Sequence, residues 1–255
     1  MKAVHYSVQQ LSELGKEQIP EPLVYGSSFI YSSPATLVYN SPGAQGFGVK
    51  RAALSVPESI MLLVAPGCCS RNTSAIAEIP AYQDRYFYLM MNETDLVTSR
   101  HLKKISTAIR EIVDSLETKP KVVMICITCV DALLATDMEA ICKKAEEETG
   151  VLVRPVYMYA LTREGHIPPM VYVRRSIYSM LQKQTRKADA MNILGFFSPL
   201  IESCELYTYL QKAGIRTIRE ISRCTNFEQY QEMSQANFNL VLDAQARYAA
   251  ADLEK

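Results

Sequence analysis

The sequence predicts an α/β protein: an open, parallel, three-layer Rossmann-like domain followed by a partial second Rossmann-like unit. Ser59–Ala65 and Val122–Thr128 are continuous apolar or β-branched runs, as expected of parallel strands covered on both faces. An amphipathic helical pattern over 100–116 connects strand patterns in the manner of a β-α-β unit. Short strand and helix patterns alternate again from Asp189. We therefore predict a first domain over 1–188 and a partial second one over 189–255.

Composition excludes several classes of partner. The chain has 255 residues, of which 48% are hydrophobic, so it can build a substantial core. Lys+Arg and Asp+Glu number 27 each, and this balance argues against nucleic acid or an anionic membrane as a partner. The N-terminus lacks a secretory signal pattern, and no apolar run is long enough to cross a bilayer. We expect a cytoplasmic protein whose cysteines are reduced thiols or metal ligands.

The first third of the chain combines one helix pattern with a loop-rich stretch. A peripheral helix is predicted over Ser7–Lys16. Residues 23–48 favour a loop or short strands ending in a glycine cluster. This cluster lacks the preceding strand and the spacing of a dinucleotide-binding fingerprint, so we favour a tight loop over a close approach of the backbone to a ligand. Tyr86–Met90 is a predicted strand, and Thr98 or Ser99 is expected to cap the helix that follows.

The central helix is delimited by its capping residues. Thr136 and Glu139 form the pattern that opens a helix by reciprocal capping, and Gly150 supplies a left-handed end. The next strand, Val151–Tyr159, contains Pro155, which is tolerated at the edge of a sheet.

A further helix and the second unit complete the prediction. The helix is expected over Tyr172–Lys187, with Arg174 and Arg175 exposed to solvent. In the second unit, the predicted strands are Met191–Phe197, Thr217–Ile221 and Phe238–Leu242, and the predicted helices are Ile201–Ala213, Asn226–Gln235 and Ala244–Leu253.

Two predicted strands lead directly into cysteines. Ser59–Ala65 is followed by Pro66, Gly67, Cys68 and Cys69, and Val122–Thr128 is followed by Cys129. The carboxyl ends of parallel strands lie at the sheet edge where α/β proteins bind ligands. The recurrence of thiols at this edge is the strongest site signal in the sequence.

The remaining thiols and histidines give weaker signals. Cys126 and Cys129 form Cys-x-x-Cys, which raises a thiol–disulfide interpretation, but Cys126 lies within the apolar strand and should be inert. Three cysteines fall on or beside helices and are expected to be small core residues: Cys142, Cys204 and Cys224. The histidines His5, His101 and His166 lack the spacing of a zinc site, although His166 could face a ligand. No phosphate-binding loop pattern is present in the sequence.

Several segments resemble one oxidoreductase family. Pro66–Cys69 resembles a Gly-Pro-x-Gly-Cys cluster loop, and Ile127–Asp131 resembles a Thr-Thr-Cys segment that precedes a helix start. Similar stretches continue at Asn92–Val97, Asn192–Gly195 and Asn237–Val241. The order and spacing of these segments, over roughly residues 39–250, resemble those of the component 1 family of nitrogenase-type oxidoreductases. This family includes nitrogenase molybdenum–iron subunits, dark protochlorophyllide reductase subunits and the tetrapyrrole reductase of coenzyme F430 synthesis.

The resemblance implies a cofactor and partners. It implies that Cys69 and Cys129 are metal ligands of an iron–sulfur cluster, of the 4Fe-4S type, shared between two subunits. Cys68 is either a neighbouring cofactor-binding residue or a buried thiol. The implied partners are a second copy of the chain or a related component 1 subunit, and a separate ATP-dependent iron–sulfur reductase.

The sequence also departs from the family pattern. Members with a larger double cluster carry a further cysteine before the glycine-rich loop, where this chain has Tyr39–Gly43. Members of ordinary length continue through the rest of a second domain and a third one, so ligands in those parts cannot be transferred. Catalytic residues and substrate therefore stay unassigned, and whether this chain is an enzyme is left open.

Two functions compete. The leading hypothesis is an electron-transfer or oxidoreductase subunit that holds a cluster through Cys69 and Cys129. The alternative is a non-catalytic binding or cofactor-assembly module that retains the fold. The leading hypothesis requires the two thiols to meet at one edge of the sheet and to face a neighbouring subunit, whereas the alternative uses the cleft at the strand ends for a small ligand or a maturing cofactor.

Overall fold

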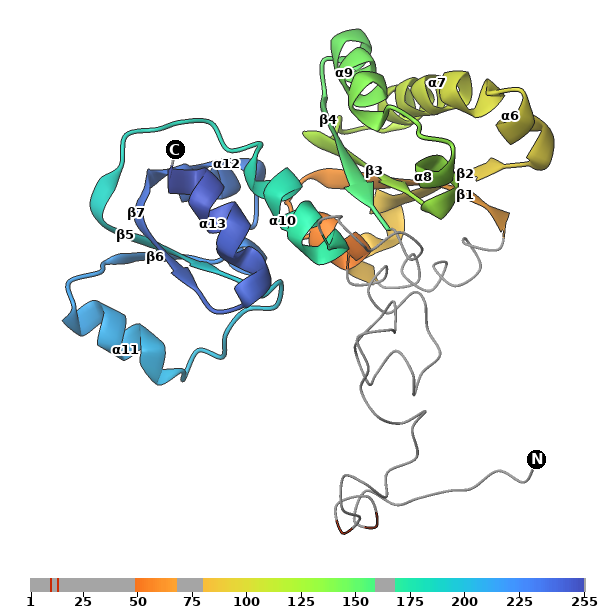
Figure 1. The fold of residues 1–255 in the computed structure, drawn as a ribbon. Helices are drawn as coiled ribbons and strands as arrows, with labels where there is room; N and C mark the ends of the chain where they lie inside the picture. The colour runs from red at the N-terminus through yellow and green to blue at the C-terminus, as the bar shows by residue number, and fades with distance from the viewer. Residues whose placement is uncertain (1–9, 11–12, 14–48, 68–79, 159–167, 255) are drawn as a thin grey trace. The chain divides into compact units, whose positions relative to one another are not determined.

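The four-stranded sheet is the framework of the first half of the chain. The computed structural model describes residues 10, 13, 49–67, 80–158 and 168–254, and the elements below belong to one compact unit within 45–255. The strands are β1 (Ser59–Pro66), β2 (Tyr86–Met91), β3 (Val122–Ile127) and β4 (Leu152–Tyr157), in the order β2-β1-β3-β4 (Figure 1). All adjacent pairs are parallel.

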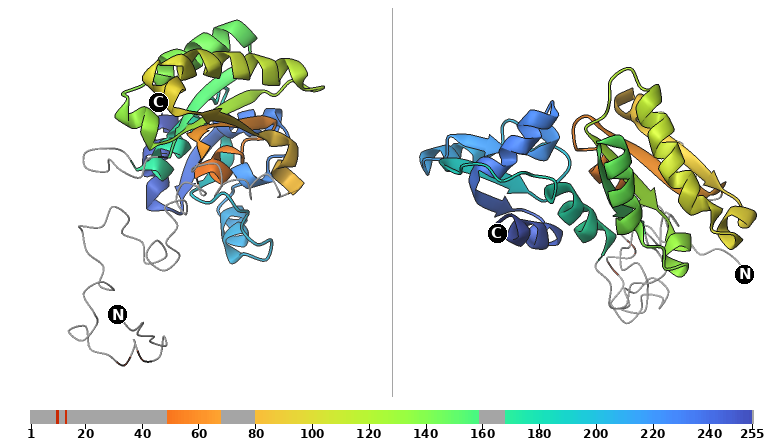
Figure 2. Two further views of the ribbon diagram at one scale, coloured as in Figure 1. Left: turned by 90° about the vertical axis from the view of Figure 1, so that its right-hand side faces the viewer. Right: turned by 90° about the horizontal axis from the view of Figure 1, so that it is seen from above.

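Helices cover both faces of this sheet. α7 (Arg100–Ser115) and α9 (Met138–Thr149) pack on one face, where Ile105, Ile109 and Val113 recur at helical spacing and are buried against the strands (Figure 2). The other face is covered by helical residues 49–53 and by α10 (Pro169–Tyr178). The strands thus alternate their side chains between two cores, which explains their continuous apolar sequences.

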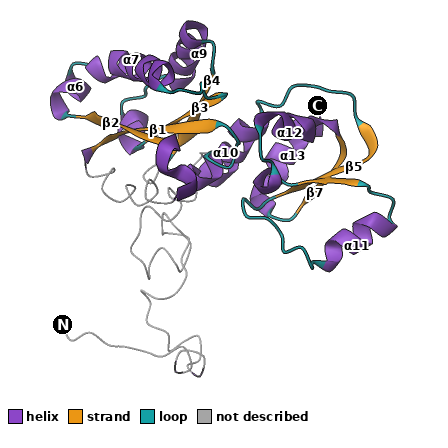
Figure 3. Ribbon diagram, turned by 180° about the vertical axis from the view of Figure 1, so that it is seen from behind, coloured by secondary structure: helices purple, strands orange, loops and turns teal. Residues whose placement is uncertain are grey.

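The second sheet has three strands. β5 (Lys187–Leu194), β6 (Thr217–Arg219) and β7 (Ala236–Val241) are parallel in the order β6-β5-β7. α10 packs against β4 and also against α13 (Figure 3). The other helices of this half are α11 (Glu205–Lys212), α12 (Phe227–Gln231) and α13 (Arg247–Glu254). The α/β fold class is confirmed, whereas the division at residue 188 stays a prediction.

Short helical turns connect these elements. The α-helical ones are α6 (Glu93–Val97) and α8 (Cys129–Leu133). The 3₁₀ turns are η3 (Pro80–Arg85), η4 (Ile221–Arg223), η5 (Glu232–Gln235) and η6 (Ala244–Ala246). The helix predicted over Asn226–Gln235 is therefore divided between α12 and η5. The helices predicted at Ile201–Ala213 and Ala244–Leu253 begin a few residues later, as α11 and α13.

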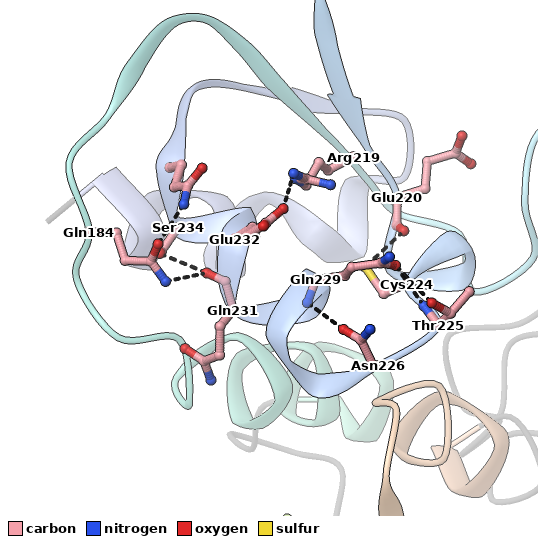
Figure 4. Close-up of polar contacts among 11 residues, drawn as sticks. Gln184, Arg219, Glu220, Cys224, Thr225, Asn226, Gln229, Gln231, Glu232 and Ser234 are labelled. Atoms are coloured by element: carbon pink, nitrogen blue, oxygen red, sulfur yellow. Dashed lines mark hydrogen bonds and ion pairs between the residues drawn. The ribbon is translucent and has the colours of Figure 1, made fainter.

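The helix predicted over Tyr172–Lys187 was placed wrongly. α10 begins at Pro169 and ends at Tyr178, and β5 already starts at Lys187. The residues between them are held by tertiary contacts, and in one of these the Gln182 backbone N–H donates to Gln231 Oε1 at 2.9 Å. In the other, which Figure 4 shows, Gln184 Nε2 donates to the Gln231 carbonyl at 3.2 Å. These contacts with the α12–η5 segment replace a continued helix.

Two predicted helix caps were also wrong. α9 is capped by Asp137, whose Oδ1 accepts from the Ala140 N–H at 3.0 Å, and not by Thr136. Ser99 precedes α7 with φ +55° and makes no side-chain capping bond. Gly150 does end α9 in the left-handed region, at φ +69°, as predicted.

Some predictions fall outside the described residues. These are the helix at Ser7–Lys16, the glycine cluster at 43–48, Cys68, Cys69 and His166. Among the residues that are described, no helix is long and apolar enough to cross a membrane.

Candidate functional site

The carboxyl edge of the first sheet, called the first edge here, brings one predicted ligand next to the exit of β1. β1 and β3 are direct neighbours, and Val64 lies opposite Ile127. Cys129 is the first residue of α8, two positions beyond the end of β3, and its side chain is half-buried. β1 ends at Pro66, beside the strand that leads into Cys129, and Cys68 and Cys69 lie outside the described residues.

Four exposed apolar side chains lie on segments at or just beyond the ends of β2 and β3. Met90 lies near the end of β2, Val97 ends α6, and Leu133 and Leu134 end the turn that begins at Cys129. Val97 and Leu133 are 87% and 68% exposed. We call these four residues the apolar rim. Large apolar side chains exposed near a candidate site are typical of a surface that another protein covers.

Three buried polar side chains belong to the β3–α8 junction and to α7, which packs on the same sheet. We call His101, Thr128 and Asp131 the polar trio; none is more than 1% exposed. Thr128 Oγ1, His101 Nε2 and both carboxylate oxygens of Asp131 have no hydrogen-bond partner among the described residues. His101 Nε2 lies 3.8 Å from Asp131 Oδ1. Burial raises the pKa of the Asp131 carboxyl, and the nearby His101 opposes this shift. The Thr136 side chain and the backbone N–H groups of Thr128 and Asp131 also oppose it, although none of them forms a hydrogen bond of ordinary geometry with the carboxylate.

A chain of polar contacts orients His101. Its Nδ1 lies 3.2 Å from the carbonyl oxygen of Asp95, and since a carbonyl only accepts, Nδ1 carries a proton. Asp95 is fixed by a capping box with Asn92 and by Lys104 Nζ, which donates to Asp95 Oδ2 at 2.7 Å. The Lys104 hydrogen bond holds the pKa of the Asp95 carboxyl below its ordinary value. Nε2 is therefore held facing Asp131.

The other described cysteines differ from Cys129 in their surroundings. Cys126 is fully buried in β3, as predicted, and Cys142 is buried on α9, where burial raises its pKa to about 12. Cys224 packs against the core, and burial raises its pKa to about 11. Cys204 was predicted to be a core residue, but it precedes α11 in a half-buried position outside both core clusters.

The end of β4 carries a tyrosine pair. The rings of Tyr157 and Tyr172 are 4.4 Å apart in an edge-to-face arrangement, and the Tyr172 hydroxyl donates to Glu139 Oε1 at 2.6 Å. Burial raises the pKa of Tyr157. These contacts tie β4, α9 and α10 together, and we assign them a structural role.

The carboxyl edge of the second sheet, the second edge, is closed by an arginine. Arg174 was predicted to be solvated, but it is 3% exposed. Its Nη2 donates to the Gly195 carbonyl at 2.5 Å and to Asp243 Oδ2 at 2.9 Å, and its guanidinium lies 4.9 Å from the Phe197 ring centroid. The prediction was wrong because helical spacing does not reveal an acceptor supplied by a later strand. Arg175 is half-exposed and pairs with Asp252.

The described part of the first edge offers one thiol, that of Cys129, to a metal–sulfur cluster. Such clusters are held by thiolates on rigid supports, and Cys129 lies on a turn anchored by a central strand. The buried, unpartnered oxygens of Thr128 and Asp131 also mark this as a polar position. The described residues contain no group of three or more His, Cys, Asp or Glu side chains that could hold a metal ion. Cys129 would therefore need further ligands from elsewhere in this chain or from another chain.

Comparison with known proteins decides the family. The sequence profile described as nitrogenase component 1 type oxidoreductase matches residues 44–255. The chain belongs to this family. The resemblance inferred from the sequence is thereby confirmed.

Curated relatives include proteins named nitrogenase iron-molybdenum cofactor biosynthesis protein NifE. That of Clostridium pasteurianum is 28% identical over 194 residues, covering 74% of this chain and 42% of the relative. That of Mesorhizobium japonicum is 31% identical over 192 residues, covering 72% of this chain and 38% of the relative. The nitrogenase molybdenum-iron protein alpha chain of Methanosarcina barkeri is 24% identical over a match that covers 60% of this chain and 29% of the relative. This family member thus spans about two fifths of the length of the NifE proteins from C. pasteurianum and M. japonicum.

A solved structure shares the fold. Nitrogenase Cp1 at pH 6.5 superimposes with a TM-score of 0.63 at 18% identity, covering 82% of this chain and 43% of that one. At this level of identity the likeness shows the component 1 fold alone.

Proposed function

We propose that this component 1 family member holds an iron–sulfur cluster at a subunit interface and acts in the assembly of a metal–sulfur cofactor. The observation that carries the proposal is Cys129, a half-buried thiol at the end of a central strand, beside the exit of β1. Cys69 is proposed as the second ligand, and Cys68 as a neighbouring residue of the cofactor. The cluster would supply a metal–sulfur core for transfer or a one-electron redox centre.

The subunit interface is proposed from the apolar rim. Two thiolates per chain are half of the four that a 4Fe-4S cluster requires, so a second copy or a related subunit would complete the set. Met90, Val97, Leu133 and Leu134 offer this partner apolar area around the cluster.

Assembly is favoured over electron transfer by the relatives. NifE proteins of C. pasteurianum and M. japonicum are named for iron-molybdenum cofactor biosynthesis. Electron transfer stays the second candidate, because one relative is a nitrogenase alpha chain. In that case, an ATP-dependent iron–sulfur reductase would be the electron donor.

The cluster is tested by anaerobic purification, reconstitution with iron and sulfide, and measurement of visible absorption and of iron and sulfide per chain. We expect the wild type to be coloured, Cys129→Ala and Cys69→Ala to lose the colour, and Cys204→Ala to keep it. Cys204 is the matched control because it is also half-buried but lies outside the first edge. Colour retained in both ligand variants would reject the assignment, and a colourless wild type would favour a module without a cluster.

An iron-transfer experiment distinguishes cofactor assembly from electron transfer. Protein loaded with isotopically labelled iron is incubated with an apo component 1 protein, and the label in the acceptor is measured. Transfer supports assembly. Retention of the label together with rapid oxidation and reduction of the cluster supports electron transfer.

The interface is tested with a charged substitution in the apolar rim. Leu133→Asp should weaken association of the chain with itself or its partner, because a carboxylate would be desolvated in the interface. Ile201→Asp is the control, since Ile201 is also largely exposed, at 73%, but lies in the second half of the chain. Light scattering after size exclusion measures the mass. Equal masses for wild type and Leu133→Asp would contradict this part of the proposal.

A further inference from the structure

The polar trio is unusual for a protein core. Buried polar groups are normally hydrogen-bonded, because an unpaired one costs about 1–3 kcal/mol. Here four such atoms, on His101, Thr128 and Asp131, lack a partner among the described residues. They come from two separate elements, α7 and the β3–α8 junction, so one local irregularity does not explain them.

The position of Asp131 connects the trio to the proposed ligand. Asp131 lies in the same five-residue turn as Cys129, two positions further on. Its backbone carbonyl accepts from the Thr136 N–H at 3.0 Å, which ties this turn to the start of the next helix. A movement of the Asp131 side chain would therefore move the backbone that presents the Cys129 sulfur.

His101 supplies a fixed counterpart on another helix. Its Nδ1 is held on the Asp95 carbonyl, and Asp95 is fixed in turn by Asn92 and Lys104. The free Nε2 faces Asp131 Oδ1 at 3.8 Å. The contact joins α7 to the turn that carries Cys129, in an interior where charges interact more strongly than in water.

We propose that Asp131 and His101 are positioning residues for the cluster ligand Cys129. Together they hold the turn that presents the thiolate of Cys129. The proposal rests on the proposed function, because it requires Cys129 to bind a cluster. It goes beyond that function by assigning roles to two residues that do not contact the metal.

Asp131 and His101 should affect both how firmly the protein retains a cluster and the reduction potential of that cluster. Outer-shell partners of metal ligands typically change metal affinity about 10–100-fold when they are replaced. Hydrogen bonds and net charge near an iron–sulfur cluster also set its reduction potential. Loss of the Asp131 carboxylate should therefore weaken retention and raise the midpoint potential.

The main experiment compares near-isosteric variants of reconstituted protein. Asp131→Asn should lose iron to a chelator about 10–100 times faster than the wild type and should show a more positive midpoint potential. Lys144→Met is the control: Lys144 is an exposed lysine on α9 that pairs with Glu148 and takes no part in the contacts described for His101. Its cluster should have the wild-type potential.

Two substitutions of His101 test the contact itself. Asn can reproduce the Nδ1 donor to Asp95 but not the nitrogen facing Asp131, whereas Gln can reproduce the latter. His101→Gln should therefore retain iron better than His101→Asn. The unfolding midpoint of each apo variant, measured in urea, separates this effect from general loss of stability, which would not move the potential of the folded protein.

The outcomes separate the two proposals. A wild type without a cluster, or a cluster unaffected by Cys129→Ala, overturns the proposed function and with it the positioning role. A cluster that depends on Cys129 but has the same potential and chelator resistance in Asp131→Asn and His101→Asn overturns the positioning role alone.

Discussion

At the second edge, both terminal nitrogens of Arg174 are hydrogen-bonded, although its Nε has no partner among the described residues. At the first edge, neither the Asp131 carboxylate nor the Thr128 hydroxyl has such a partner. Both edges are carboxyl ends of parallel sheets, where α/β proteins commonly bind ligands. The second edge uses its buried polar groups to join β5, β7 and α10. The first edge keeps such groups unpaired beside a half-buried thiol.

This difference indicates how stability is distributed between the edges. Satisfied buried groups stabilise the folded state, and unsatisfied ones destabilise it. We infer that the second edge is built for folding and that the first edge retains a cost typical of functional sites. The comparison predicts opposite signs for the removal of polar groups at the two edges.

The largest effect is expected from Arg174→Ala. It would leave the partly buried Asp243 carboxylate without its ion pair and the Gly195 carbonyl without its donor. The free energy of unfolding, measured in urea, should fall by about 3–5 kcal/mol. The matched control is Arg175→Ala, at the adjacent position. The ion pair between Arg175 and Asp252 is roughly half-exposed, so its loss should lower the free energy of unfolding by at most about 1 kcal/mol. If both variants lowered the free energy of unfolding equally, Arg174 would contribute no more than a half-exposed ion pair, and the second edge would not be built for folding.

The sequence was sufficient to predict the strands of both edges but not the contacts at the second one. The apolar runs of β1 and β3 and the left-handed Gly150 depend on local pattern, and they were predicted correctly. The burial of Arg174 depends on Asp243, which lies 69 residues further along the chain. Helical spacing contains no information about such a partner.

The first edge was predicted in part for the same reason. Cys129 follows a strand, so its position at the edge follows from local sequence. The burial of His101 opposite Asp131 depends on how α7 packs over the sheet, and the sequence offered only an isolated histidine. An apolar helix face that includes a histidine is a signal that could have pointed to it, because His101 lies one turn before the buried Ile105. Cys69 lies outside the described residues, so its role stays a prediction.

Gly195→Ala should have the next largest effect. Gly195 has φ +140°, and an added Cβ would lie 2.7 Å from the Asp243 backbone nitrogen. Strain and overlap together should lower the free energy of unfolding by about 2–3 kcal/mol. Gly150→Ala is the control, because Gly150 also has positive φ but has nothing within 4 Å of an added Cβ. It should cost about 1 kcal/mol. If the control costs as much as Gly195→Ala, the second edge is not tightly closed.

Thr128→Val tests the sign predicted for the first edge. Valine has nearly the same shape as threonine and removes a buried hydroxyl without a partner among the described residues. The apo protein should become more stable by about 1–2 kcal/mol, or stay unchanged. Ser59→Ala should do the opposite, since the buried Ser59 hydroxyl donates to the Val56 carbonyl at 2.7 Å and accepts from Arg85 at 2.9 Å. Clear destabilisation by Thr128→Val would mean that its hydroxyl is satisfied and that the first edge carries no such cost.

The smallest effect is expected away from both edges, at the start of α12. Asn226 Oδ1 accepts from the Gln229 N–H at 2.8 Å, as Figure 4 shows, and this caps the helix. Asn226→Ala should lower the free energy of unfolding by about 1 kcal/mol, and Asn226→Asp should restore most of it because aspartate keeps the acceptor. Urea unfolding with several probes would measure both variants. Because this cap lies on neither edge, the two variants should leave cluster retention unchanged. A loss of iron in Asn226→Ala would show that global stability alone determines how well the first edge retains a cluster. That result would contradict the separate roles inferred for the two edges.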